Sequence, residues 1–333
     1  MTRKALITGI TGQIGSYLAE ILLEKKYEVI GFARSQDLAM LPASLAGKVK
    51  TLQVDIGNLE LLEKSILDLQ PDEIYNFAAQ SNSQISFGIA EETFHLNALA
   101  VVRLCETARK LSRPAKVFQA STAELYGGVY EHPVNEETPF YPKNPYGIAK
   151  LAAYWAIRNY RETQGAFFVN GIIFNSESPR RGEAFVTKKI VKTIAEIIKG
   201  KQEVLRLGNL NARRDWSHAQ DTAKAAWTML QAEKAADYVI ASGVAHSVRE
   251  FVEIAFKHAG IEIAWRGEGV QEEGYDKNTG KVRVAIDTQF FRPAELKSLI
   301  GDSSKLHKEL GWSQKYPFDA LVSEMLDVEL EKL

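Results

Sequence analysis

The chain has 333 residues, of which 45% are hydrophobic and 25% are charged, and its formal net charge at pH 7 is −1. This composition is typical of a globular protein and argues against a nucleic-acid or membrane surface, and no run of about 18 apolar residues suggests a spanning helix. Cys105 is the only cysteine, which excludes an intramolecular disulfide, and no signal-peptide pattern opens the chain, so we expect a cytoplasmic protein.

The first predicted unit is a strand, a glycine-rich turn and a helix. The apolar run Lys4–Thr8 is followed by Gly9, Gly12 and Gly15, and then by the helical pattern of Tyr17–Glu24. Glycines in such a turn let a pyrophosphate approach the amides of the helix N-terminus. The G-x-x-G-x-x-G spacing differs from the common G-x-G-x-x-G fingerprint. One glycine would suffice for a plain turn, so three in this context favour cofactor binding.

The end of the second predicted strand indicates which nicotinamide cofactor binds. Tyr27–Ala33 forms this strand, and Arg34 and Ser35 follow it. A free ribose 2′-hydroxyl is usually met here by an acidic residue, whereas an arginine suits a 2′-phosphate. The sequence therefore favours NADP, although the nearby Asp37 keeps NAD as the alternative.

Two further strands continue the pattern. Val49–Asp55 is a predicted strand whose terminal Asp55 is suited to accept from an adenine amino group. After a helix at Leu59–Leu69 comes the strand Glu73–Ala79, whose small terminal residues let a cofactor lie close. The polar loop Gln80–Gln84 is placed to contact both cofactor and substrate.

The next strand leads to candidate reactive groups. Lys116–Ala120 is a predicted buried strand, and Ser121, Thr122 and Glu124 follow it. The end of a parallel strand is the usual place for a substrate in an open α/β sheet. Taken alone, Glu124 is more typical of a solvated loop carboxylate; together with the hydroxyl residues, it forms a candidate acid/base.

A tyrosine and a lysine four residues apart follow Pro145. Tyr146 and Lys150 share one face of a predicted helix. A lysine ammonium beside a phenol favours the phenolate and lowers the tyrosine pKa, so we predict that Tyr146 acts as a base. The spacing also occurs by chance on helix surfaces, but the glycine turn and Glu124 favour the catalytic interpretation.

Strands and helices alternate through the first half of the chain. Helices are predicted at Ala90–Leu111 and Tyr146–Thr163, and a further strand at Ala166–Ile173. This order is typical of an α/β fold, a Rossmann-type doubly wound parallel sheet with a smaller C-terminal substrate-binding domain. The predicted domains are a dinucleotide-binding domain, 1–174 with 215–242 returning to it, and a substrate domain, 175–214 and 243–333.

Basic segments mark the predicted substrate domain. The loops Asn175–Gly182 and Gly208–Trp216 carry paired arginines, and the helix Phe185–Lys199 carries several lysines. Such clusters suit a diphosphate, although each lysine taken singly is better explained by solubility. The acidic, glycine-containing segment Gly267–Lys281 is predicted to be a mobile loop. The histidines show no metal-ligand spacing with Asp, Glu or Cys, so no metal is expected.

These motifs resemble the extended short-chain dehydrogenase/reductase superfamily and, within it, the GDP-mannose 4,6-dehydratase family. The resemblance covers nearly the whole chain. It is carried by Ala5–Gln13, Pro71–Asn76, Ala78–Ser81, Gln119–Gly127, Glu177–Glu183, Gly208–Leu210, Arg214–Trp216, His246–Phe251 and Phe291–Glu295. The last five stretches, from Glu177–Glu183 onward, lie outside the cofactor domain and therefore bear on the substrate.

The resemblance implies a set of functional residues. The implied catalytic residues are Thr122, Glu124, Tyr146 and Lys150. The implied cofactor contacts are Gly9, Thr11, Gly12, Gln13, Ile14, Gly15, Arg34, Ser35, Asp55, Ile56, Phe77, Ala78, Ala79, Gln80, Ser81, Tyr146, Lys150 and Arg181. The implied substrate contacts are Ser81, Asn175, Lys189, Arg214, Arg292 and Glu295.

The activity that the resemblance implies is NADP-dependent conversion of GDP-mannose to GDP-4-keto-6-deoxymannose by internal hydride transfer. In that mechanism Tyr146 takes the proton of the sugar 4-hydroxyl, Thr122 hydrogen-bonds the forming ketone, and Glu124 removes the C5 proton. The alternatives are a GDP-manno-heptose 4,6-dehydratase, a GDP-sugar epimerase or 4-reductase, and a non-catalytic NADP-binding protein. Glu124 argues against a simple reductase.

The chain departs from the family pattern in four places. Ile14 stands where the family usually has aspartate, Ala123 where it has serine, and Ser176 where it has histidine, and these changes leave open a hexose or a heptose substrate. The segment after Arg34 is shorter than in the family. We therefore expect a homodimer more than a tetramer, with the helices from Ala90 and from Tyr146 pairing across a two-fold axis.

Overall fold

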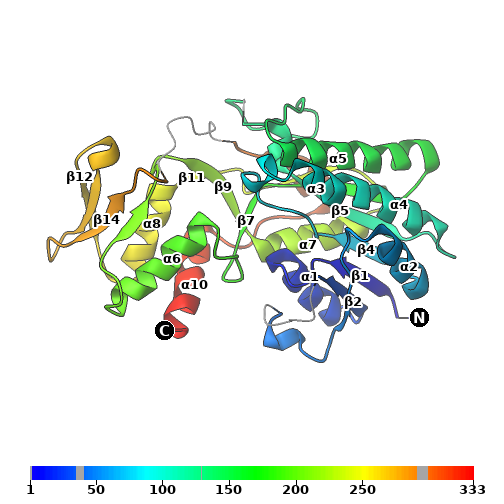
Figure 1. The fold of residues 1–333 in the computed structure, drawn as a ribbon, viewed down its shortest axis with the longest axis horizontal. Helices are drawn as coiled ribbons and strands as arrows, with labels where there is room; N and C mark the ends of the chain where they lie inside the picture. Colours follow the sequence, from blue (N-terminus) through cyan, green and yellow to red (C-terminus); the bar gives the residue numbers. More distant parts are fainter. Residues whose placement is uncertain (1, 35–40, 129, 291–298) are drawn as a thin grey trace.

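The computed structural model describes residues 2–34, 41–128, 130–290 and 299–333. Within these ranges, the larger part is built on a seven-stranded parallel sheet of order β10-β6-β5-β4-β1-β2-β3 (Figure 1). Its strands are β1 (Lys4–Thr8), β2 (Glu28–Ala33), β3 (Lys50–Gln53), β4 (Glu73–Asn76), β5 (Lys116–Thr122), β6 (Phe168–Ile173) and β10 (Tyr238–Ile240). The predicted α/β fold class is confirmed.

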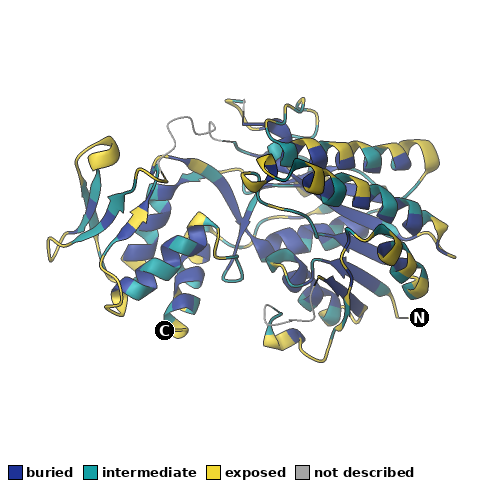
Figure 2. Cartoon of the chain, in the orientation of Figure 1, coloured by how far each residue is buried: buried dark blue, intermediate teal, exposed yellow. Residues whose placement is uncertain are grey.

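Helices cover both faces of this sheet. One face carries α1 (Gln13–Glu24) and α7 (Ala219–Leu230), and the other carries α2 (Leu59–Leu69), α4 (Ala100–Lys110) and α5 (Pro145–Gln164). Figure 2 shows the central strands between these layers as buried. Because both faces are covered, the central strands are nearly continuous apolar runs rather than alternating ones.

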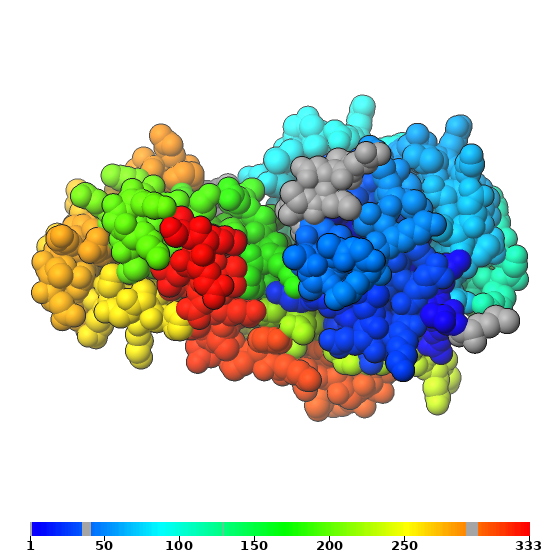
Figure 3. All heavy atoms as spheres, turned by 90° about the horizontal axis from the view of Figure 1, so that it is seen from below, coloured from blue at the N-terminus to red at the C-terminus, as the bar shows by residue number. Residues whose placement is uncertain are grey.

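The smaller part contains two short sheets and three helices. The sheets are β11-β9-β7, made of β7 (Asn175–Glu177), β9 (Arg213–His218) and β11 (Ala245–Ser247), and β12-β13-β14-β8, made of β8 (Leu205–Leu207), β12 (Ile263–Arg266), β13 (Glu273–Asp276) and β14 (Val282–Ile286). The helices α6 (Val186–Ile198), α8 (Val248–His258) and α10 (Phe318–Glu331) enclose a separate apolar core. In Figure 3 these green-to-red segments lie beside the blue N-terminal part. Then α9 (Ser304–Leu310) packs against β10.

The predicted helix Ala90–Leu111 is confirmed with one irregularity, because α3 (Ala90–Phe94), the π-helix η3 (His95–Leu99) and α4 follow one another without a break. A π-turn adds one residue to the turn, and buried Asn97 in this turn bonds the backbone of Gln80 through both its oxygen and its nitrogen. The predicted loop Gly267–Lys281 is wrong in part, because it contains β13, which pairs with β12 and β14. Among the described helices, none has the length and apolar character for crossing a membrane.

Candidate active site

The predicted site motifs lie where neighbouring parallel strands end. From β1 the sheet continues through β2 and β3, whereas from β4 it continues in the opposite direction through β5 and β6. Such a change of direction is where ligands bind in open α/β sheets. The glycine turn follows β1, the segment Phe77–Ser81 follows β4, and the residues after Thr122 follow β5. Three of the predicted motifs therefore meet at one edge.

The glycine turn has the backbone that a dinucleotide site requires. Gly9 has φ +70°, and a Cβ there would lie 2.9 Å from the Ala78 nitrogen. A Cβ at Gly15 would lie 2.4 Å from the Gly9 carbonyl oxygen. Gly12 precedes α1, and no side chain of the described residues caps this helix, whose first turn holds no acid. The first N–H groups of α1 are thus suited to an anion.

Two buried polar atoms near the ends of β4 and β5 have no hydrogen-bond partner in the described ranges. They are Oε1 of Gln80, which follows β4, and Oγ of Ser121, the second-last residue of β5. Buried polar atoms are almost always paired, so these two are suited to polar groups of a ligand. Together with the N-terminus of α1, they fit a nicotinamide dinucleotide lying across the ends of these strands.

The predicted adenine end of the cofactor site is exposed. Arg34 follows β2, and its carbonyl oxygen accepts a hydrogen bond from the Gln53 side chain at 3.2 Å. Oδ1 of Asp55 accepts from the backbone nitrogen of Gly57 at 2.9 Å. Ser35, the other residue predicted here, lies outside the described residues.

Gln13 links the glycine turn to the smaller part of the chain. Its Nε2 donates to the carbonyl oxygen of Ser176 at 2.7 Å, and its Oε1 accepts from Oγ of Ser178 at 2.8 Å. Ser176 also shares a 2.7 Å hydrogen bond with Thr222 on α7. Because its side chain is engaged on both atoms, Gln13 offers a cofactor mainly its backbone.

A buried hydrogen-bonded chain runs across three strands to Lys150. Thr8 donates to Asn76 at 2.5 Å, and Asn76 donates to Gln119 at 2.7 Å. Gln119 and Lys150 both donate to the carbonyl oxygen of Ala120, each at 2.9 Å. Burial lowers the pKa of Lys150 to about 8. These hydrogen bonds fix the position of the Lys150 amine from the interior of the sheet.

The pKa of Tyr146 shifts in the direction opposite to the prediction. Burial raises it to about 12; hydrogen bonding with Thr122 lowers it, the charge of Glu124 raises it, and that of Arg181 lowers it. Nζ of Lys150 lies 5.9 Å from the centre of the tyrosine ring and donates elsewhere. Desolvation of the phenolate therefore outweighs the neighbouring cations in the protein itself.

Glu124 lies in the short 3₁₀ helix η4 (Ala123–Tyr126), directly after β5. Oγ1 of Thr122 accepts a hydrogen bond from the Glu124 backbone nitrogen at 3.2 Å and caps this turn. Oε2 of Glu124 accepts from Nδ2 of Asn144 at 3.0 Å. Both Thr122 and Glu124 shift the pKa of Tyr146, so the three predicted reactive groups lie together.

Arg181 brings the loop after β7 to the same place. Its guanidinium forms a 3.2 Å ion pair with Glu177 and lies 3.4 Å from the centre of the Phe185 ring. Its positive charge lowers the pKa of Tyr146. The neighbouring Arg180 instead pairs with Glu20 on α1 at 2.8 Å.

The predicted substrate contacts are more dispersed. Nζ of Lys189 lies 3.6 Å from the centre of the Phe290 ring, and burial lowers its pKa. Nδ2 of Asn175 donates to the carbonyl oxygen of Asp215 at 3.4 Å, and Arg214 donates to the carbonyl oxygen preceding it in the chain. Arg292 and Glu295 lie outside the described residues. No cluster of three or more metal-binding side chains occurs in the described ranges.

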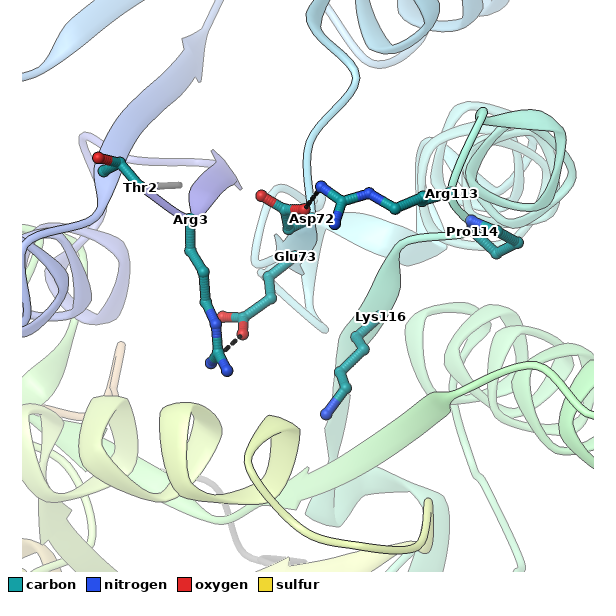
Figure 4. Close-up of a pocket in the computed structure, with 7 residues that line it drawn as sticks. All are labelled: Thr2, Arg3, Asp72, Glu73, Arg113, Pro114 and Lys116. Atoms are coloured by element: carbon teal, nitrogen blue, oxygen red, sulfur yellow. Dashed lines mark hydrogen bonds and ion pairs between the residues drawn. The ribbon is translucent and has the colours of Figure 1, made fainter.

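A separate hollow lies at the opposite edge of the sheet, where β1, β4 and β5 begin (Figure 4). Its charged groups pair with one another: Arg3 lies 3.5 Å from Glu73, and Arg113 lies 2.6 Å from Asp72. None of the predicted site residues lines it. The hollow is therefore separate from the predicted site.

The chain is similar to known proteins over nearly its whole length. The chain matches the family model described as GDP-mannose 4,6 dehydratase over residues 6–325. A GDP-mannose 4,6 dehydratase of Drosophila melanogaster is 48% identical over 98% of this chain and 86% of its own length. The enzyme of that name from Homo sapiens is 48% identical over 98% and 91%. The structure of dTDP-glucose 4,6-dehydratase from Bacillus anthracis in complex with NAD shares the fold, with a TM-score of 0.79, 24% identity, and coverage of 99% of this chain and 97% of that one.

Proposed function

The chain belongs to the GDP-mannose 4,6-dehydratase family, and on that premise we propose that it converts GDP-mannose to GDP-4-keto-6-deoxymannose. The observation that carries this proposal is the grouping of Thr122, Glu124 and Tyr146. A reductase or a simple dehydrogenase needs the hydroxyl and the phenol but has no use for the carboxylate. A dehydratase needs all three.

The residues divide the proton transfers between them. Tyr146 removes the proton of the sugar 4-hydroxyl, and Thr122 hydrogen-bonds the oxygen that becomes the ketone. Glu124 then removes the acidified C5 proton as water leaves from C6. When bound, a nicotinamide supplies hydride acceptance and return, and its oxidised ring adds a positive charge that lowers the pKa of the phenol. Arg181 acts on Tyr146 in the same direction.

Isotope routing tests this function. Turnover of GDP-mannose in D₂O should place solvent deuterium at C5 of the product, since Glu124 exchanges its proton with water. A label at C4 should reappear at C6 of the same molecule, and free NADPH should be neither formed nor consumed. Consumption of NADPH in step with product would instead identify a reductase.

The substrate assay should include a GDP-manno-heptose. Ala123 and Ser176 both carry smaller side chains than the residues that the family pattern has there, and both are buried. Smaller side chains favour a longer sugar if they line its pocket. A higher kcat/KM for the heptose would make it the substrate, with the same chemistry.

NADP is the proposed cofactor because an arginine follows β2. A guanidinium meets a 2′-phosphate with charge-assisted hydrogen bonds. Protein stripped of nucleotide should bind NADP more tightly than NAD by calorimetric titration, and Arg34→Ala should remove most of the difference. Arg206→Ala, an exposed arginine on β8, is the matched control. Equal affinities of the parent protein for the two cofactors would contradict the proposal.

A homodimer is supported by an apolar surface on α3, η3 and α5, which pack together. Its exposed side chains are Phe94 (40%), Leu99 (49%), Ile148 (45%) and Trp155 (51%). Exposed apolar clusters of this kind mark interfaces, and pairing with the same face of a second copy would cover them.

Disrupting this surface should separate the subunits. Trp155→Glu should convert a dimer into a monomer in light scattering, because a carboxylate would be buried at the interface. Val270→Glu, with Val270 50% exposed in the short helix η5 (Gly269–Gln271), should leave the mass unchanged. A parent tetramer that survives dilution would contradict the dimer.

We propose that 1–174 with 215–242 holds the dinucleotide and that 175–214 with 243–333 holds the nucleotide sugar. The parallel pairing of β10 with β6 supports the return of the chain to the first domain. The single cysteine, Cys105, is free and buried, which supports a reducing cytoplasm.

A further inference from the structure

The residue that caps helix α5 also contacts the carboxylate of Glu124. Oδ1 of Asn144 accepts a hydrogen bond from the Gly147 nitrogen at 2.7 Å and thereby caps the helix. Its Nδ2 donates to Oε2 of Glu124 at 3.0 Å. Because the oxygen is committed to the helix, the amide plane is fixed and its nitrogen faces the carboxylate. One side chain thus joins the start of α5 to the candidate base.

Both ends of this contact are held rigidly. The Tyr141 nitrogen donates to the Leu125 carbonyl oxygen at 2.8 Å, which ties the segment before α5 to η4. Gly127 has φ +63°, and a Cβ there would lie 1.9 Å from the Tyr141 carbonyl oxygen. A Cβ at Gly147 would lie 3.0 Å from the Glu124 carbonyl oxygen. The close backbone packing keeps Asn144 and Glu124 at a constant separation.

We propose that Asn144 is a positioning residue that orients Glu124 for removal of the C5 proton; this inference rests on the proposed dehydratase function. The hydrogen bond from Asn144 holds Oε2 of Glu124. Oε1 has no hydrogen-bond partner in the described part of the chain and is left to face the substrate. In the step, the C5–H bond breaks and the proton goes to Oε1. The electron pair left on C5 is held as the enolate of the 4-ketone. It then forms the C5=C6 double bond as the C6–O bond breaks, and Glu124 gives its proton to the departing 6-hydroxyl, which leaves as water. Tyr146 lies two residues after Asn144, so the start of α5 places both bases.

Two substitutions separate this role from helix capping. Serine and aspartate both cap helices well, but neither presents an N–H to Glu124, and aspartate places a like charge beside it. Asn144→Ser should lower kcat by about 10–100-fold, as expected for a misplaced catalytic group, with KM little changed, and Asn144→Asp should lower it further. Asn58 caps α2 in the same way, through Oδ1 and the Leu61 nitrogen, and belongs to neither of the segments that hold Glu124 and Tyr146, so Asn58→Ser is the matched control and should keep parental turnover.

Isotope effects then locate the affected step. In Asn144→Ser, deuterium at C5 should slow turnover more than in the parent, and deuterium at C4 should slow it less, because C5 deprotonation becomes the slower step. A merely structural role would not shift the two effects in opposite directions. Parental turnover in both Asn144 variants, or unchanged isotope effects, would overturn the proposal.

A measurement without substrate separates this proposal from the proposed function. In protein labelled with ¹⁵N-asparagine, the side-chain amide resonance assigned by its loss in Asn144→Ser should move when Glu124 is replaced by glutamine. An unmoved resonance would overturn the contact, whatever the activity. If the resonance moves while the parent protein dehydrates neither GDP-sugar, the proposed function fails and the role in C5 deprotonation is overturned with it.

Discussion

Replacing Glu124 with glutamine should lower turnover of the GDP-sugar by a factor of about 10²–10⁴, the range typical of removing a general acid/base. Binding of cofactor and substrate should persist, because glutamine is nearly isosteric and its side-chain oxygen can still accept from Asn144. Steady-state kinetics with calorimetric binding measures both quantities. The variant should still permit reversible oxidation at C4, so transfer of the C4 label to the bound cofactor should survive, while deuterium uptake at C5 should cease.

Glu137→Gln is the control for this variant. Glu137 is an exposed carboxylate in the loop before α5, and its replacement should leave turnover within the error of the parent. If dehydration survived Glu124→Gln nearly intact, Glu124 would be only a loop carboxylate, and the assignment of the C5 base would be abandoned.

Replacing Tyr146 with phenylalanine should lower turnover by a similar factor of about 10²–10⁴, but at an earlier step. Without the phenol, the proton of the 4-hydroxyl has no acceptor, so neither the C4 label nor the C5 proton should exchange. The fold should tolerate the change. Burial of this side chain is unfavourable to an ionised phenol, but a phenyl ring carries no charge and can be buried in its place. Product formation, isotope exchange and thermal unfolding are measured on the same samples.

Tyr130→Phe is the matched control for this second variant. The Tyr130 hydroxyl donates to the Pro139 carbonyl oxygen at 2.7 Å and not to a reactive group, so turnover should be retained. Isotope exchange at C5 in Tyr146→Phe at the parental rate would contradict the assignment of Tyr146 as the first base.

The action of Tyr146 as a base in the parent protein depends on the charges around its phenol. A tyrosine with a pKa of about 12 is protonated at neutral pH, so its activity as a base depends on the positive charges brought near it. Arg181 is one such charge and comes from the loop after β7, far from Tyr146 in the chain. No local pattern around Tyr146 contains this information.

The sequence by itself determined the fold class, because apolar runs, glycine turns and helical periodicity are local signals of the parallel sheet. It also indicated Thr122, Glu124, Tyr146 and Lys150, since their spacing places them at a strand end and on one helix face. Only the tertiary structure decided how these residues are held. The hydrogen-bonded series from Thr8 to Lys150 crosses three strands, and Asn144 donates to Glu124, 20 residues away in the sequence. It also reversed the predicted shift of the Tyr146 pKa. Burial and hydrogen-bond partners depend on which distant segments pack together. They set the free energy of ionising a group more than its neighbours in the sequence do.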